Sequence, residues 1–207
     1  MDADVDVHAG MDRLDRAHRR IRGLAIAALL IAVGAGLRGA PDAIATSRAG
    51  ELERVVIRDA AGRVRAGLGV GADGNPALVL FDANEKLRVT LEVDPTGAGL
   101  LRLFDASGAP RVGLTADSRG GAALRLSDGG GRTRAVIGVS PESQPSVALI
   151  DESSALRVTM AVRPDGAAGI NLLDRNGRVR ALLGAEHSGT GVLSFYDEKT
   201  KSLWRAP

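Results

Sequence analysis

The chain has 207 residues, of which 44% are hydrophobic, 2% aromatic and none cysteine, and its formal net charge is +2. Because the chain has no thiol group, it cannot contain disulfides, iron–sulfur clusters or the common structural zinc sites. The near-neutral charge and the scarce aromatic rings argue against nucleic acid as a partner, because they provide neither electrostatic attraction nor a surface on which bases stack.

A polar segment and an apolar run begin the chain. Residues 1–22 are rich in both aspartate and arginine, and Gly23–Leu37 follow without a charge. As a helix this run spans about 22 Å, which is shorter than the ~30 Å hydrocarbon core. Adjacent apolar residues and the snorkelling side chains of Arg22 and Arg38 extend its reach. We therefore expect a transmembrane helix or signal anchor over residues 23–40, with a buried core helix as the alternative.

The distribution of arginine predicts the orientation of this anchor. Most of the nearby arginines precede the apolar run, so the positive-inside rule keeps residues 1–22 in the cytoplasm. The chain beyond a linker at 41–54 is then periplasmic or extracellular, and the lipid bilayer is the partner of the N-terminal helix. Ala43-Ile44-Ala45 has the small-x-small form of a signal-peptidase site, so secretion after cleavage near Ala45 is the competing interpretation.

Residues 55–207 form an array of seven 23-residue repeats with a C-terminal cap. Aspartate recurs without slippage at Asp59, Asp82, Asp105, Asp128, Asp151, Asp174 and Asp197. Arginine follows six residues after each of the first six, at Arg65, Arg88, Arg111, Arg134, Arg157 and Arg180. A large apolar residue follows nine residues after each of the same six aspartates, and a leucine or phenylalanine lies two residues before each aspartate from Asp82 on. A fixed period of this length is typical of a repeat architecture.

Each repeat predicts two short strands and two turns. In the repeat that begins at Asp105, Val112, Leu114 and Ala116 alternate with small or polar residues, which is the period-2 pattern of a half-buried strand. Asp105 and Gly108 supply turn chemistry, because the aspartate accepts hydrogen bonds from nearby N–H groups and glycine tolerates a positive φ. The exported part is therefore expected to be all-β.

The strict register favours a β-solenoid, in which each repeat is one coil and equivalent strands stack in parallel. The apolar columns would then face one another across a thin core, and the arginine column would lie in solvent on the opposite strand face. An antiparallel β-meander, or a trimeric β-shaft built from it, is the alternative, because the Asp-x-x-Gly turns also suit hairpins.

Two columns invite functional interpretations. The aspartates could form a cation-binding ladder, but the GGxGxD motif of calcium-binding β-rolls is missing, so we expect each aspartate to cap its own turn and pair with a nearby arginine. The six arginines of the column are the candidate binding residues, because stacked guanidinium groups recognise polyanions such as acidic polysaccharides or lipid headgroups. Pairing with the aspartate column is the favoured reading, since the two columns neutralise each other.

No residue pattern points to catalysis, to a metal or to a cofactor. His187 lies in a Gly/Ser-rich turn without an orienting acid or a nucleophile elbow, so we expect a loop histidine. The carboxylates recur in register rather than converging on one cleft, which is the opposite of an active site.

The segments VRAGLGV, LRVTLEV and VRALLGA, together with LVLFD, LRLFD and INLLD and the closing SLWRAP, resemble a group of bacterial proteins. That group has one N-terminal membrane helix and tandem 23-residue GRxRAxLG/LxLxD β-repeats. The resemblance covers essentially the whole chain and implies the architecture, but carries over no activity or site residue.

These observations favour a non-enzymatic, membrane-anchored structural or interaction module of the cell envelope. The alternative is a binding module for an anionic glycan or lipid through the arginine column. A homo-oligomer, for instance a trimer, is possible under the meander alternative, because a meander has one apolar face to cover.

Overall fold

A computed structural model describes residues 47–48, 51–52 and 54–206 of the chain. The polar segment, the expected transmembrane helix and the cleavage site at Ala45 lie outside the described residues. Within the described part, no helix is long and apolar enough to cross a membrane. The chain divides into two compact units after Leu78.

The first unit contains two short antiparallel pairs. Strand β1 (Ser47–Arg48) pairs with β2 (Glu51–Leu52), and β3 (Arg54–Arg58) pairs with β4 (Val64–Val70). Strand β5 (Pro76–Phe81) crosses the division between the units.

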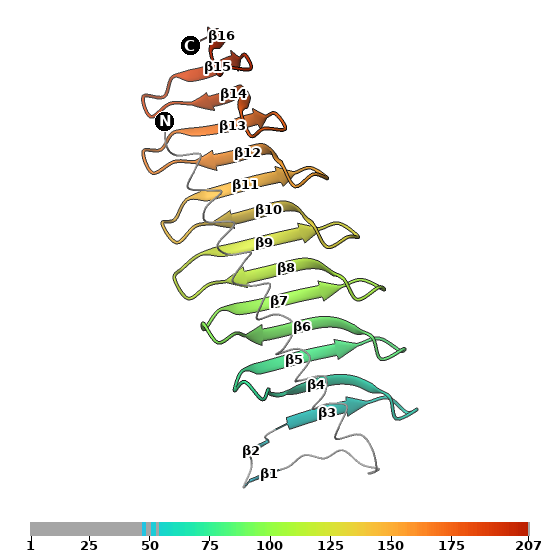
Figure 1. Ribbon diagram of the computed structural model, residues 1–207. Helices are drawn as coiled ribbons and strands as arrows, with labels where there is room; N and C mark the ends of the chain where they lie inside the picture. The colour runs from blue at the N-terminus through green and yellow to red at the C-terminus, as the bar shows by residue number, and fades with distance from the viewer. Residues whose placement is uncertain (1–46, 49–50, 53, 207) are drawn as a thin grey trace. The chain divides into compact units, whose positions relative to one another are not determined.

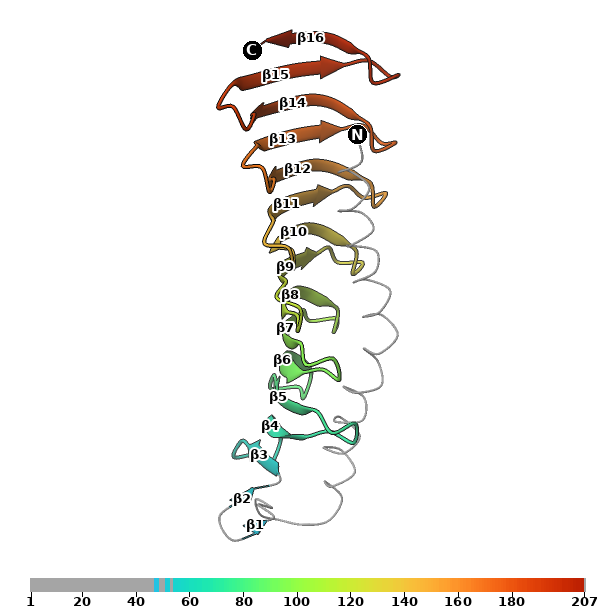
Figure 2. The same cartoon turned by 90° about the vertical axis from the view of Figure 1, so that its left-hand side faces the viewer.

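The second unit is a single sheet layer in which each strand pairs antiparallel with the next (Figure 1). Its strands are β6 (Leu87–Val93), β7 (Gly99–Phe104), β8 (Pro110–Ala116), β9 (Ala122–Ser127), β10 (Thr133–Val139), β11 (Pro145–Ile150), β12 (Leu156–Val162), β13 (Ala168–Leu173), β14 (Val179–Ala185), β15 (Gly191–Tyr196) and β16 (Ser202–Ala206). In Figure 2, β7 to β9 are seen nearly end-on while β13 to β16 are seen along their length, so the layer has the usual twist of β-sheets. Within this unit the sheet order follows the chain from β6 to β16, and the sheet that these strands form does not close on itself.

The all-β prediction is confirmed, but the β-solenoid is wrong and the antiparallel meander is correct. The reason lies in the turns. Gly108 N–H donates to the Asp105 carbonyl at 3.0 Å, Asp105 N–H donates to the Ala109 carbonyl at 3.0 Å, and Gly108 has a φ of 85°. This is a three-residue hairpin loop with a bulge, and it reverses the chain.

The second turn of each repeat has the same construction. Asp117 N–H donates to the Gly121 carbonyl at 2.8 Å, and Gly120 N–H donates to the Asp117 carbonyl at 3.2 Å. Because both turns reverse the chain, a repeat is one up strand and one down strand rather than one coil, and equivalent strands are separated by a neighbour of opposite direction.

The packed side chains of the second unit lie on the face opposite the leucine columns. Ala148, Leu156 and Leu173 are buried there, and Val136, Ile150 and Val179 pack against them. In contrast, Leu114 is 44% exposed. The expectation that the leucine columns face a core within the chain is therefore wrong for the described residues, because a single layer leaves that face uncovered.

Candidate functional site

One face of the second unit carries two columns of exposed apolar side chains, and we call it the apolar face. The first column, 44–55% exposed, lies on alternate strands and consists of Leu91, Leu114, Ile137, Met160 and Leu183. The second column, 38–49% exposed, lies on the strands between and consists of Leu103, Leu126, Leu149, Leu172 and Phe195. Cross-strand pairs such as Leu103 with Val112 and Leu114 with Leu124 place both columns on the same face.

The composition of the apolar face is uniform from β6 to β15. Every strand position that shares this face from Val89 to Phe195 is Gly, Ala, Pro, Val, Leu, Ile, Met or Phe. The opposite face mixes charged, polar and apolar residues, among them Arg102, Arg125 and Asn171. No charged side chain therefore occupies these paired positions of the apolar face.

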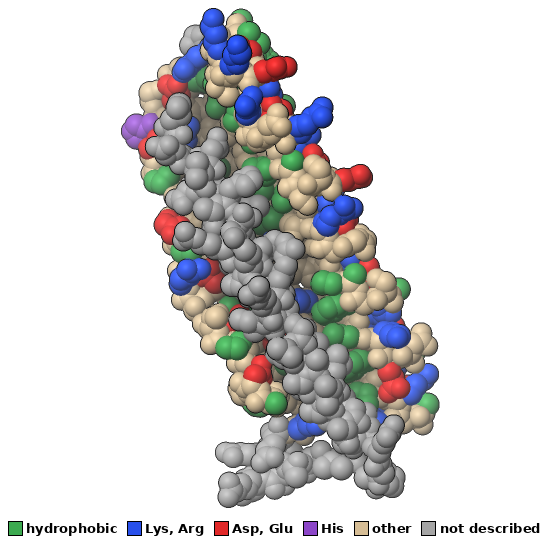
Figure 3. Space-filling model, in the orientation of Figure 1, with side chains coloured by type: hydrophobic (Ala, Val, Ile, Leu, Met, Phe, Trp, Pro, Cys, Tyr) green, Lys and Arg blue, Asp and Glu red, His purple; other side chains and the backbone are tan. Residues whose placement is uncertain are grey.

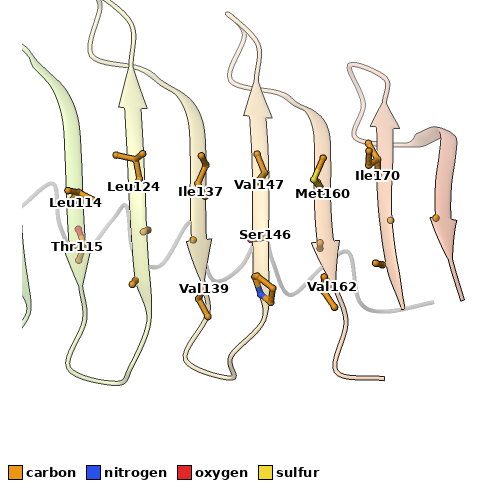
Figure 4. Close-up of a pocket in the computed structure, with 18 of the residues that line it drawn as sticks. Leu114, Thr115, Leu124, Ile137, Val139, Ser146, Val147, Met160, Val162 and Ile170 are labelled. Carbon is orange, nitrogen blue, oxygen red and sulfur yellow. The ribbon is translucent and has the colours of Figure 1, made fainter. Parts of the chain in front are cut away.

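A shallow groove of about 730 Å³ lies on the apolar face across β8 to β14. Figure 4 shows its central row, in which Leu114, Leu124, Ile137, Val147, Met160 and Ile170 lie at one level on successive strands. Val139 and Val162 lie in a second row nearer the second turns. The groove is lined mainly by hydrocarbon, so it suits burial of apolar surface rather than chemistry on a polar substrate.

The aspartate column lies in the first turns, at one edge of the strands, and each member caps its own turn. Asp105 Oδ1 accepts hydrogen bonds from Ser107 N–H at 2.9 Å and from Ala109 N–H at 3.1 Å. The same two bonds, from the residues two and four positions on, recur at all seven aspartates. The expected capping role is confirmed.

The arginine column occupies β-bulges beside these turns. Leu149 pairs with Val158 and Ile150 pairs with Leu156, which leaves Arg157 as the extra residue between them. Equivalent shifts in register occur at Arg65, Arg111, Arg134 and Arg180. A bulge bends the strand and redirects the side chain, so the guanidinium turns toward the turn that precedes it.

Each of the six candidate arginines pairs with the aspartate six residues before it. The shortest N–O distances are 2.6 Å for Arg180–Asp174, 3.2 Å for Arg157–Asp151, 3.3 Å for Arg111–Asp105, 3.6 Å for Arg65–Asp59 and 4.0 Å for Arg134–Asp128, and Arg88 pairs with Asp82. Figure 3 shows the consequence, which is that acidic and basic side chains are interspersed along the edges. The favoured prediction of mutual pairing is confirmed.

Some of these arginines also join one repeat to the next. Arg111 Nε donates to the Ser127 carbonyl at 2.8 Å, and Arg157 Nε donates to the Leu173 carbonyl at 2.9 Å. Both carbonyls lie directly before the aspartate of the following repeat. The edge is thus a network in which a guanidinium holds its own turn and its neighbour.

Hydrogen bonding lowers the pKa of five of these aspartates. The Ser107 hydroxyl lowers the pKa of Asp105 to about 2, and the Ser153 hydroxyl does the same to the pKa of Asp151. The backbone N–H four residues on is the largest cause of the lowered pKa of Asp82, Asp128 and Asp174. These carboxylates are therefore committed acceptors, which is unlike a general acid or base poised near neutral pH.

The remaining polar candidate is His187, which lies in the exposed turn between β14 and β15. Its Nδ1 forms a hydrogen bond with the Asp165 carbonyl of the adjacent second turn. Among the described residues, no group of three or more His, Asp or Glu side chains is placed to hold a metal ion.

The favoured solenoid missed the apolar face, because it assigned the leucine columns to an internal core, whereas the meander alternative has one apolar face to cover. The sequence signal for this face is a second turn halfway through the repeat. Asp94-x-x-Gly97 and Asp117-x-x-Gly120 have the Asp-x-x-Gly form of the first turns and lie 12 residues after Asp82 and Asp105. Two equivalent hairpin turns in every repeat predict an open meander, whose apolar face has no cover within the layer.

No family model matches the chain, and no curated protein matches it. Among solved structures, the SAS-4 (dCPAP) TCP domain from Drosophila melanogaster, in complex with a proline-rich motif of Ana2, is 16% identical with a TM-score of 0.30, over 75% of this chain and 96% of that chain. The TCP10 domain of Danio rerio CPAP is 12% identical with a TM-score of 0.27, over 80% of this chain and 99% of that chain. The TcdB2-TccC3-Cdc42 structure is 10% identical with a TM-score of 0.21, over 72% of this chain and 11% of that chain. Likenesses this distant carry no argument about function.

Proposed function

We propose that the chain is a non-enzymatic structural or interaction module of the cell envelope, held at the membrane by its N-terminal apolar run, and that its sheet associates through the apolar face. One observation carries this proposal. Ten large apolar side chains, from Leu91 to Phe195, stand 38–55% exposed in two columns on an uncharged face. Continuous exposed apolar surface beyond a few hundred Å² is rare in monomeric proteins and marks an interaction site.

The charged edge supports an architectural role for the repeats. Each first-turn aspartate is used by backbone N–H groups and by an arginine, as at Asp105 and Arg111. Such groups hold the turns in register and leave few free polar atoms for turnover of a substrate. The regular edge therefore acts as a frame for the apolar face.

The membrane part of the proposal rests on Gly23–Leu37 and on the arginines that precede it. Protease added to spheroplasts should degrade residues 46–207 and leave about the first 20 residues protected. Protection of the repeats would overturn the proposed orientation. Release of the chain into the soluble periplasm would favour cleavage near Ala45.

Association through the apolar face is tested by cross-linking in intact cells. Leu114→Asp places a carboxylate in the centre of the face, and Ala106→Asp places the same charge in an exposed turn as a matched control. Cross-linked adducts of the wild-type chain should be lost with Leu114→Asp and retained with Ala106→Asp. Adducts that survive both substitutions would contradict the proposal.

Binding of an anionic glycan or lipid by the arginine column is the weaker alternative. Its support is the regular spacing of six guanidinium groups along one edge, and its difficulty is that each is already paired with a carboxylate. Retention of the chain on a heparin-type resin distinguishes this alternative from the structural proposal. Retention that is lost when Arg111, Arg134 and Arg157 are changed to Gln would favour the alternative, and passage without retention would remove it.

A further inference from the structure

We infer that the occupant of the apolar face is the apolar face of a second copy of this chain, so that two sheets pack face to face as a sandwich. This inference rests on the proposed function and names its partner. A sheet with one apolar face requires a second layer, and the aligned packing of two sheets about 10 Å apart is one of the few stable solutions.

The charges favour a second copy. Bringing two identical surfaces together ordinarily sets like charges against each other, which is costly. Here the facing strand positions from Val89 to Phe195 carry no charge and no polar side chain, so two copies meet without burying an unpaired group. The charged groups of the edge, such as Asp105 and Arg111, stay in solvent at the margin.

The shape of the face also favours its own copy. Exposed residues of the first column, such as Leu114 and Ile137, alternate along the layer with less exposed neighbours such as Leu124 and Val147. Within this row the prominent side chains therefore recur every second strand, about 9.6 Å apart, with recesses of the same spacing between them. A surface with equal spacing of ridges and recesses interdigitates with itself.

The area is sufficient for a stable dimer. The eleven strands β6 to β16 extend the face over about 50 Å, and the central five residues of a strand give it a width of about 17 Å. Each copy would then bury roughly 800 Å², which is the share of one partner in a standard protein–protein interface. A bilayer surface fits less well, because binding of this kind uses a rim of unpaired basic residues and interfacial aromatics, whereas the edge arginines are paired.

The natural absence of cysteine makes a direct test available. Val147 lies on β11, the central strand of β6 to β16, so in either two-fold arrangement of the sandwich it lies near its own copy. The full-length chain bearing Val147→Cys is oxidised in isolated membranes without detergent. Ser146→Cys, one residue away on the opposite face of the same strand, is the matched control.

We expect Val147→Cys to yield a disulfide-linked dimer and Ser146→Cys to yield little. Adding Leu114→Asp and Met160→Asp to Val147→Cys should lower the cross-linked fraction by roughly tenfold or more, because two copies would bury unpaired carboxylates. Light scattering of the wild-type chain in amphipol should give the mass of two copies of the chain.

Three results would overturn the inference. A one-copy mass with no Val147→Cys cross-link would assign the face to lipid or to a different protein, and would leave the proposed interaction role standing. A three-copy mass would favour a trimeric shaft. Equal cross-linking of Ser146→Cys would show that the copies do not meet through the apolar face.

Discussion

Asp151 and Arg157 form an ion pair within one hairpin, with 3.2 Å between Arg157 Nη1 and Asp151 Oδ2. The two partners have unequal structural roles. Asp151 also accepts hydrogen bonds from the N–H groups of Ser153 and Ala155, at 2.9 and 3.0 Å, whereas Arg157 donates in addition to the Leu173 carbonyl. The aspartate therefore organises the turn, and the arginine reinforces it.

This inequality predicts the ranking of two substitutions. Arg157→Gln should lower the free energy of unfolding by about 1 kcal/mol or less, because it removes a solvent-accessible ion pair. Asp151→Ala should lower the melting temperature further, because two turn N–H groups lose their acceptor. Thermal melts followed by circular dichroism compare the two. A larger effect of Arg157→Gln would mean that the ion pair, and not the turn, carries the stability.

Strained turns predict a stabilising substitution. Ser154 has a φ of 66° at the loop position where Gly108 and Gly177 stand in other repeats. A side chain in this left-handed region costs roughly 1 kcal/mol relative to glycine. Ser154→Gly should therefore raise the free energy of unfolding by about 0.5–1 kcal/mol in urea titrations, and Glu85→Gly should act alike. Glu152→Gly, in the same turn without a positive φ, is the control and should not stabilise.

The architecture of single repeats could be predicted from the sequence, whereas their association could not. The columns through Asp105, Arg111 and Leu114 identify the turn, its ionic partner and the alternation of a strand by local rules alone. Parallel and antiparallel stacking preserve the same columns, so the register cannot separate a solenoid from a meander. The turn geometry separates them, and its signal at Asp117 and Gly120 is weakened in repeats with Ser143 in place of glycine.

Local sequence rules likewise do not decide whether an apolar strand face lies inside the protein or on its surface. Alternation shows that Val112 and Leu114 share one face of β8, but not whether that face is covered. In one layer the apolar side is exposed, and the arginines lie half-exposed against carbonyls and carboxylates, with Arg111 at 39%. Whether an apolar column is a core or an interface depends on the number of layers, which no single strand encodes.

Close packing of neighbouring strands predicts different costs at two glycines. A Cβ at Gly184 would lie 2.5 Å from the Ala168 carbonyl oxygen, and one at Gly113 would meet nothing within 4 Å. Gly184→Ala forces the backbone of β13 or β14 to move and should cost about 1–3 kcal/mol. Gly113→Ala should be neutral or slightly stabilising, because alanine loses less conformational entropy on folding. Urea titrations measure both, and equal effects would contradict this strand packing.

The lowered pKa values predict loss of stability in acid. Asp105 and Asp151 have pKa values of about 2 in the folded chain, against an ordinary value of 3.8. Because the folded pKa lies below the unfolded one, their contribution is fully present above pH ~4 and is lost as the pH falls toward ~2. The melting temperature should therefore fall across this window. Ser107→Ala should raise the pKa of Asp105, as followed by carboxyl chemical shifts in NMR, while leaving that of Asp151 unchanged.

The single tryptophan reports on one end of the sheet. Trp204 on β16 lies against Phe195 on β15, with ring centroids 5.8 Å apart, and β16 is the last strand in the sheet order. Phe195→Leu keeps the site apolar but removes a ring contact that contributes about 0.5–1.5 kcal/mol. In repeat arrays each unit depends on its neighbours, so damage at an end stays near that end.

The urea midpoint from Trp204 fluorescence should fall, while the midpoint from far-ultraviolet circular dichroism should move less. Leu103→Ala lies far from β16, so it should lower the circular-dichroism midpoint more than the Trp204 fluorescence midpoint. Coincident shifts of both probes in both variants would mean that the sheet unfolds as one cooperative unit.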